Sequence, residues 1–258
     1  MSSLVELVAP ARMGTGFRRL LASSWLSNIG DGVALAAGPL LLAELTRNPF
    51  LISLAVLLQR LPWMLFGLYA GVLADRLDRR RLVATVDMVR AAVIGALAVT
   101  VLTDVATVWI VLAALFVLGV AETFADIATG TLLPMTVDPV DLGIGNARLV
   151  FGFQALNQLA GPPLGAALFG IGMAVPFVTQ AVVVAAAARL VAGMTIRRAP
   201  EPVRRGSARA EIVDGVRWLW HHGPMRTLTL TIVLFNVTFG AAWSVLVLYS
   251  LDHLGMGG

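Results

Sequence analysis

The stretch GVLADRLDRRRL, residues 71–82, interrupts an apolar sequence with two aspartates and four arginines. Apolar runs long enough to cross a membrane lie on both sides of it, at about 49–74 and 82–103. Two helices that cross a bilayer in opposite directions need a short turn at the membrane surface, where charged side chains reach water. The stretch therefore predicts a helix–turn–helix unit of a polytopic membrane protein.

The composition of the whole chain agrees with this prediction. Of its 258 residues 58% are hydrophobic and 13% are charged, and its mean hydropathy of +0.86 is far above that of a water-soluble globular domain. All 19 basic residues are arginines, and most of them lie beside apolar runs. We therefore expect a lipid bilayer as the partner of these arginines, and no nucleic acid.

Several kinds of site are excluded by residue types alone. The absence of cysteine rules out a disulfide framework and a thiolate metal site. The three histidines, at positions 221, 222 and 253, are too few and too scattered for a metal cluster. Neither a G-x-x-x-x-G-K-[ST] phosphate loop nor a hydrolase motif is present in the apolar runs. We expect no metal, no cofactor and no enzymatic activity.

Seven apolar intervals are long enough to cross a membrane, which predicts an all-α bundle of about seven transmembrane helices. The charge-free interval between Arg148 and Arg189 is about twice the length that one crossing needs. A turn-prone segment, Gly170–Pro176, lies near its middle, so this interval is counted as two spans. The seven predicted spans are about 20–45, 49–74, 82–103, 105–135, two within 149–188, and 227–251.

The arginines predict how the chain is oriented. If the seven spans alternate in direction, one side of the membrane receives nearly all the arginines that lie outside the spans, and the other side receives only Arg47. Because basic loops stay in the cytoplasm, we expect the N-terminus to be cytoplasmic, in the inner membrane of a bacterium. The arginines of the basic side are Arg12, Arg18, Arg19, Arg76, Arg79, Arg80, Arg81, Arg148, Arg197, Arg198, Arg204, Arg205, Arg209, Arg217 and Arg226.

Three parts follow from this arrangement: a six-helix part over 1–196, a cytoplasmic loop over 197–225, and a seventh span within 226–258. The loop opens with RRAPEPVRRGSAR, which is typical of a linker. Apolar residues then recur at helical spacing, at 212, 213, 216, 219 and 220. They predict an amphipathic helix, either on the inner membrane surface or packed on the cytoplasmic ends of the spans.

Residues Gly71 to Arg80 resemble the loop between the second and third helices of the major facilitator superfamily, G-x-L-x-D-R-x-G-R-R, with Asp78 where the usual pattern has glycine. The variant is similar to the branch of bacterial efflux proteins that includes siderophore and macrolide exporters. The resemblance implies that spans one to six form the N-terminal half of a two-half transporter. It also implies a conformational latch formed by Gly71, Asp75, Arg76, Arg79 and Arg80.

In that latch Asp75 would bridge Arg79, an acid on span four, and the second half. Span four offers Glu122 and Asp126 on one face, and we expect Asp126, near the cytoplasmic end, to be the relay. The alternative interpretation is that the charged loop only anchors the helices by the positive-inside rule.

A second resemblance lies in span five. Gly161, Pro162 and Gly165 are similar to the G-P-x-x-G-G segment of antiporters in this family, although Asn157 and Ala166 replace two of its glycines. Proline bends the helix and the glycines permit close packing, which would suit a pivot helix. An ordinary kink in a membrane helix, with no pivot role, would have the same residues. We expect this face, like the Gly67–Gly71 face of span two, to pack against the second half.

Ionisable residues inside spans are costly and therefore indicate function. Asp31 in span one is a candidate proton carrier or a structural acid, and Arg60 in span two is its expected partner or a site for an anionic substrate. Asp87 and Arg90 lie one turn apart near the expected interface, where pairing or snorkelling would explain them.

Together these features predict a secondary exporter that moves an amphipathic small molecule, such as a drug, siderophore or macrolide, by alternating access, driven by protons. The rival hypothesis is a truncated membrane protein that does not transport and acts only through partners. The short second half motivates it: either a C-terminal half is missing or a second copy of the chain completes the transporter.

Overall fold

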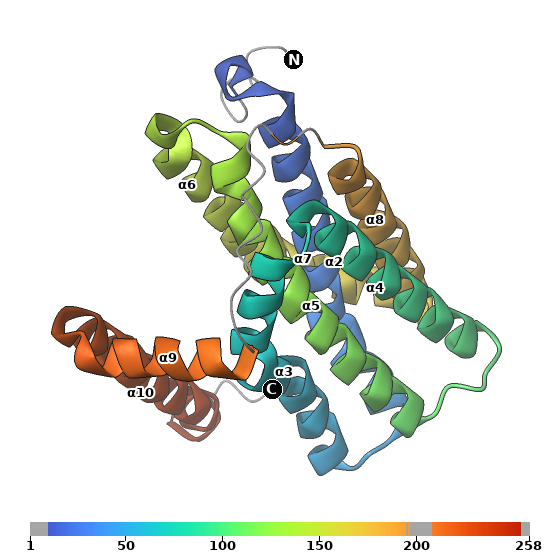
Figure 1. The fold of residues 1–258 in the computed structure, drawn as a ribbon. Helices are drawn as coiled ribbons and strands as arrows, with labels where there is room; N and C mark the ends of the chain where they lie inside the picture. The colour runs from blue at the N-terminus through green and yellow to red at the C-terminus, as the bar shows by residue number, and fades with distance from the viewer. Residues whose placement is uncertain (1–9, 195, 197–207, 254–258) are drawn as a thin grey trace. The chain divides into compact units, whose positions relative to one another are not determined.

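The structure is a computed structural model that describes residues 10–194, 196 and 208–253. Every regular element in these residues is a helix, as the all-α prediction requires (Figure 1). The chain divides into two compact units, Met1–Arg204 and Arg205–Gly258, each of which is described by itself.

The helices of the first unit follow the predicted spans closely. Five described helices are long and apolar enough to cross a membrane: 11–45, 50–76, 79–102, 108–136 and 175–192. A further continuous helix over 142–171 corresponds to predicted span five, and the predicted turn near Gly172 follows it. The elements are η1 (Ala11–Met13), α2 (Gly14–Leu45), α3 (Pro49–Arg76), α4 (Arg79–Leu102), α5 (Val108–Thr136), η2 (Pro139–Asp141), α6 (Leu142–Gly152), η3 (Phe153–Ala160), α7 (Gly161–Ile171) and α8 (Val175–Ala192).

Short polar side chains set the start of three of these helices. The side chains of Asn48, Asp78 and Thr107 each accept a hydrogen bond from a backbone N–H of the first turn, in α3, α4 and α5 respectively. Such N-caps satisfy donors that the helix itself leaves without a partner. They fix where these three helices begin.

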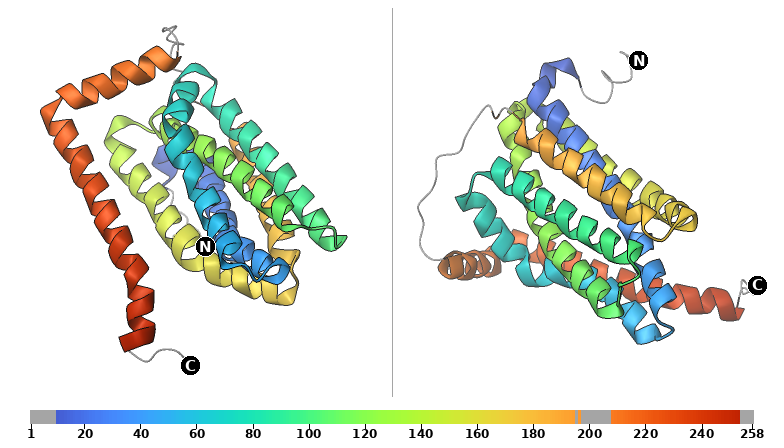
Figure 2. Two further views of the ribbon diagram at one scale, coloured as in Figure 1. Left: turned by 90° about the horizontal axis from the view of Figure 1, so that it is seen from below. Right: turned by 90° about the vertical axis from the view of Figure 1, so that its right-hand side faces the viewer.

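Helix α2 lies at the centre of the unit. It packs against α5, α8, α7 and η3, while α4 packs between α5 and α8, and α3 packs mainly on α5 (Figure 1). The two further views agree with this arrangement (Figure 2). The central position of α2 brings its polar residues next to groups from several helices.

The interior of the bundle has two apolar clusters. One is built around Leu41, Ile94 and Leu115, and the other around Phe17, Val83 and Leu132. Along α2, α4 and α5, the residues of one cluster are separated from those of the other by buried or cavity-facing polar side chains. The bundle therefore carries a polar layer between its two apolar ends.

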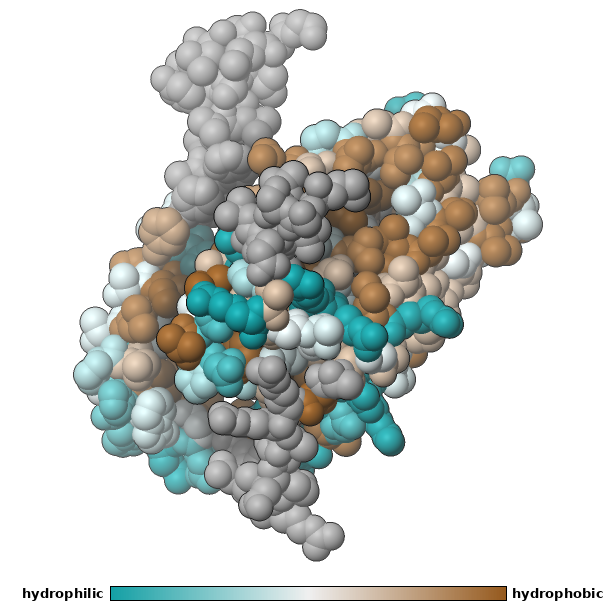
Figure 3. Space-filling view, turned by 90° about the horizontal axis from the view of Figure 1, so that it is seen from above, coloured by the Kyte–Doolittle hydropathy of each residue, from teal (hydrophilic) through white to brown (hydrophobic). Residues whose placement is uncertain are grey.

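The outer surface fits a lipid environment. Large apolar side chains on α3 are exposed, among them Met64, Leu65 and Leu68. Viewed from one end, hydrophilic side chains gather at the end of the bundle, and hydrophobic ones cover much of its flank (Figure 3). A bilayer would cover such flanks at little cost in solvation free energy.

The second unit consists of α9 (Ala208–His221) and α10 (Gly223–His253), which meet at the turn around His222 (Figure 2). Helix α9 is the predicted amphipathic helix, and its side chains Val213, Val216, Trp218 and Trp220 are exposed. Its place on the membrane surface or on the helix ends stays a prediction, as do the boundaries at 196 and 225.

Candidate functional site

The charged turn that follows α3 ties this helix to α5. Arg79 Nη2 lies 2.8 Å from Asp75 Oδ1, so the structure contains the pairing that the sequence led us to expect. The same guanidinium donates through Nε to the carbonyl of Ala74 and lies 3.5 Å from the sulfur of Met135 on α5. Because one side chain contacts both helices, the turn holds their ends together.

The next two arginines of the turn have different partners. Arg80 donates to the carbonyl of Met194 over 2.9 Å, and Arg19 of α2 donates to the carbonyl of Gly193. These carbonyls follow α8, so two arginines from other helices bind the C-terminal end of α8. Arg81 lies 3.6 Å from Asp78 on the exposed surface of the turn.

Asp78 itself explains why this position need not be glycine. Its Oδ1 accepts a hydrogen bond from the backbone N–H of Arg81 over 3.1 Å and thereby caps α4. Aspartate is among the best N-cap residues, and glycine is only slightly worse. The departure from the family pattern is thus compatible with an intact turn.

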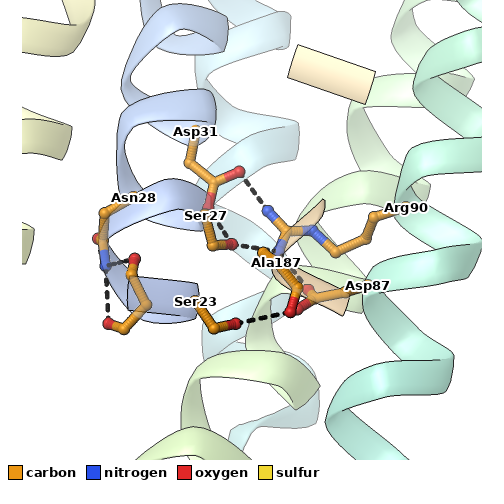
Figure 4. Close-up of polar contacts among 8 residues, drawn as sticks. Ser23, Ser27, Asn28, Asp31, Asp87, Arg90 and Ala187 are labelled. Carbon is orange, nitrogen blue, oxygen red and sulfur yellow. Dashed lines mark hydrogen bonds and ion pairs between the residues drawn. The ribbon is translucent and has the colours of Figure 1, made fainter. Parts of the chain in front are cut away.

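A buried ion cluster lies deeper in the bundle. Arg90 of α4 forms ion pairs with Asp31 of α2 and with Asp87, one turn before it on α4 (Figure 4). It also donates to the hydroxyl of Ser27, which in turn lies 3.4 Å from Asp31. The Arg90 side chain is only 2% exposed, and those of Asp31 and Asp87 are less than a tenth exposed.

The expected partner of Asp31 is wrong: it is Arg90, not Arg60. Of the two explanations for Asp87 and Arg90, pairing holds, and Arg90 does not reach toward the membrane surface. Spacing along one helix correctly paired Asp87 with Arg90, but it carries no information about which face of α4 meets α2. The long arginine side chain turns inward because two carboxylates and a hydroxyl satisfy it there.

Arg60 instead belongs to a central cavity of about 220 Å³. This cavity brings it together with Glu122 and Asp126 of α5, three of the residues singled out in the sequence. Two carboxylates and one guanidinium therefore border one open cavity, where Arg60 and Asp126 are exposed and Glu122 is partly buried. The residues around it are Leu35, Gln59, Arg60, Trp63, Glu122, Asp126, Phe153, Asn157 and Gln158.

The expected relay between Asp75 and Asp126 is not formed among the described residues. The contact of the charged turn with α5 is Met135, nine residues after Asp126 and thus roughly 14 Å further along the helix. Asp126 lies beside the cavity instead. Asp126 was assigned to the latch because it was expected to lie near the cytoplasmic end of its helix. Helix α5 continues to Thr136, so Asp126 lies well before that end.

Span five borders the cavity through a π-helical segment, η3. The N–H of Gly161 bonds to the carbonyl of Leu156, five residues back. Pro162 and Pro163 have no N–H to offer, so the α-helical pattern is already broken at this point. Phe153, Asn157 and Gln158 of η3 reach the cavity.

The glycines of this span pack within the same half, contrary to our expectation. A Cβ added at Gly161 would meet the backbone of Gly32, and one added at Gly165 would meet the backbone of Val33, both on α2. By contrast, a Cβ at Gly67 or Gly71 on α3 would meet open space. Of these two glycine faces, the one on α3 remains open for further packing.

Sequence reasoning missed several cavity and cluster residues. Arg90 and Asp87 were assigned to the interface, and Ser27, Asn157 and Gln158 were not connected with the charges. One signal was present: Ser23, Ser24, Ser27 and Asn28 place polar groups on two turns of an otherwise apolar helix.

Comparison with known proteins agrees with the fold and the charged turn. Residues 20–258 match the family model of the Major Facilitator Superfamily. Macrolide efflux protein A of Streptococcus pyogenes is 27% identical over 155 residues, 60% of this chain and 38% of that protein. Macrolide efflux protein A of Enterococcus faecalis is 28% identical over 115 residues, 45% of this chain and 35% of that protein. No solved structure gives a significant match.

The chain thus spans well under two thirds of the length of these curated relatives. Its family match, however, covers both the first unit and the second. With its helical bundle, its charged turn after α3 and this match over nearly all its residues, the chain belongs to the major facilitator superfamily.

Proposed function

We propose that the protein works in a secondary exporter that moves an amphipathic small molecule out of a bacterial cell in exchange for protons. The observation that carries this proposal is the central cavity, which Arg60, Glu122 and Asp126 line together between membrane-spanning helices. Ionisable groups at this depth are costly, and functional sites are where membrane proteins retain them.

The lining of the cavity supports an amphipathic cargo. Leu35, Trp63 and Phe153 offer apolar and aromatic surface, while Gln59, Asn157 and Gln158 offer amide hydrogen bonds. Drugs, siderophores and macrolides combine such surfaces, and both relatives described above carry the name of a macrolide efflux protein. We place the protein in the inner membrane with a cytoplasmic N-terminus, where export would begin.

Proton coupling is supported by the count of charges. The cavity has two carboxyl groups for one guanidinium, and so has the cluster of Arg90. Each set is electrically neutral when one proton is bound and carries one excess negative charge when it is not. Binding or release of a proton would therefore change the net charge of each set, and with it the free energy of holding that set in the membrane interior.

The first test is efflux by the full protein in a bacterium that lacks its own macrolide exporters. We expect cells that express it to accumulate less radiolabelled erythromycin than vector controls, and a protonophore to remove the difference. Glu122→Gln keeps the shape of the side chain but removes its charge, and we expect it to abolish gradient-driven efflux.

Thr131→Val is the matched control, because the Thr131 hydroxyl bonds only to the carbonyl of Ala128 on its own helix. It should export like the parent protein. Equal accumulation in expressing and vector cells, with the protein inserted in the membrane, would contradict the proposed function. That result would favour the rival hypothesis of a membrane protein that acts through partners alone.

A further inference from the structure

A second, much smaller chamber lies next to the central cavity. Its volume is about 20 Å³, which is enough for a single water molecule. Nearly all the residues around it are polar: Ser23, Ser24, Ser27, Asn28, Asp87, Ala125, Asp126 and Thr129. A chamber of this size with several hydrogen-bonding groups meets the requirements for a buried water, whereas an apolar one would stay dry.

The chamber connects the two charged sets of the bundle. Asp126 borders both the central cavity and the chamber. Asp87 borders the chamber and is the ion-pair partner of Arg90. Ser27 also borders it and hydrogen-bonds with Arg90 and Asp31 (Figure 4). Asp126 and Asp87 thus line the same chamber.

We propose that this chamber is a proton relay in which one water molecule links Asp126 in the central cavity with Asp87 in the Arg90 cluster. In the transfer, the carboxylic acid of Asp126 gives its proton to the water, and the water gives a proton to the carboxylate of Asp87. Asp126 is left as a carboxylate, Asp87 becomes the acid, and the water is restored.

The transfer moves one negative charge from the Arg90 cluster to the central cavity. Before it, the Arg90 cluster holds one guanidinium and two carboxylates; after it, the cluster is neutral, and the cavity has gained a negative charge. A cationic cargo in the cavity would favour this state by Coulomb attraction and so give the transfer a direction. The charged groups that face one another around the relay are Asp31, Asp87, Arg90, Arg60, Glu122 and Asp126.

The relay rests on the proposed export function, and its test separates the two. The full protein is reconstituted in vesicles that contain a pH-sensitive dye, and two rates are measured. One is the proton movement that erythromycin drives. The other is the exchange of labelled for unlabelled erythromycin at equal concentrations, which needs no net proton movement.

Thr129→Val replaces one of the chamber's hydroxyl groups by a methyl group of nearly the same size, and Ala125→Val fills the chamber itself. We expect both variants to slow erythromycin-driven proton movement about tenfold or more while exchange stays within about twofold of the parent. Two variants are used so that, if one of them folds poorly, the other still tests the relay. The control Thr131→Val, on the same helix but outside the chamber, should leave both rates unchanged.

Normal proton movement in both chamber variants would overturn the relay and leave the export function intact. Equal losses of exchange and proton movement would also overturn it, because the chamber would then serve structure or cargo binding. A parent protein that neither exchanges erythromycin nor moves protons would overturn the relay and the export function together.

Discussion

Arg90 of α4 holds Asp31 of α2 in an ion pair that is closed off from solvent, and the same guanidinium binds Asp87. The pair joins two helices through the polar layer that separates the apolar clusters of the bundle. Buried charges are tolerated only when they are paired, so each member of this cluster constrains the others.

Removal of Arg90 should therefore cost more stability than removal of either acid. Arg90→Met would leave two carboxylates without a counter-charge, and we expect a loss of about 3–5 kcal/mol in the free energy of unfolding. Asp31→Asn leaves the pair of Arg90 with Asp87 in place and should cost less. Thermal or denaturant unfolding of both variants in detergent measures the two losses in stability.

The triple variant Arg90→Met with Asp31→Asn and Asp87→Asn is the control for this comparison. It removes all three charges together, so we expect it to recover most of the stability that Arg90→Met loses. Equal stability of Arg90→Met and Asp31→Asn would show that the cluster is not electrostatically coupled.

The glycines of span five should be intolerant of even one added carbon. Gly161→Ala and Gly165→Ala would drive a methyl group into the backbone of α2, and we expect each to cost about 1–3 kcal/mol. Gly67→Ala and Gly71→Ala have open space and serve as matched controls. Melting temperatures in detergent should fall for the first pair only; equal effects in both pairs would refute the close approach of α2 and α7.

The charged turn should act on conformation rather than on stability. Asp75 is 68% exposed, so loss of its ion pair with Arg79 in Asp75→Asn should change the free energy of unfolding by only about 0–1 kcal/mol. If the turn is a latch, however, the variant should slow transport and shift the balance between inward-open and outward-open forms.

The chain has no cysteine, so a single cysteine placed at Gln158 in the cavity can report this balance without background labelling. We expect Asp75→Asn to change its labelling rate from each side of the membrane. Arg81→Gln, which removes an exposed charge of the same turn, is the control. Identical labelling in the parent and Asp75→Asn proteins would contradict the latch and show that the turn serves only as a membrane anchor.

The N-cap at Asp78 provides a further, purely structural prediction. Asp78→Ala removes the acceptor for the Arg81 N–H and should destabilise the protein by about 1 kcal/mol. Asp78→Gly, the residue of the usual family pattern, should cost only a few tenths of that. Unfolding titrations that rank glycine below alanine would contradict the capping role.

The sequence predicted the spans well because membrane crossing depends on apolar length, a local property. It also predicted the pair of Asp75 and Arg79 and that of Asp87 and Arg90, since both lie within one turn of helix. Errors began where two helices meet. The partner of Asp31, the neighbours of Asp126 and the packing of Gly161 all depend on which faces of separate helices touch.

By itself, then, the sequence determined that this is an all-helical membrane protein with a charged turn after its second span and costly charges inside the bilayer. Only the tertiary structure decided which charges share a site: Asp31 with Arg90, and Arg60 with Glu122 and Asp126. The physical reason is that helical periodicity orders residues along one axis, whereas ion pairs and cavities between helices depend on rotation and depth, which packing sets.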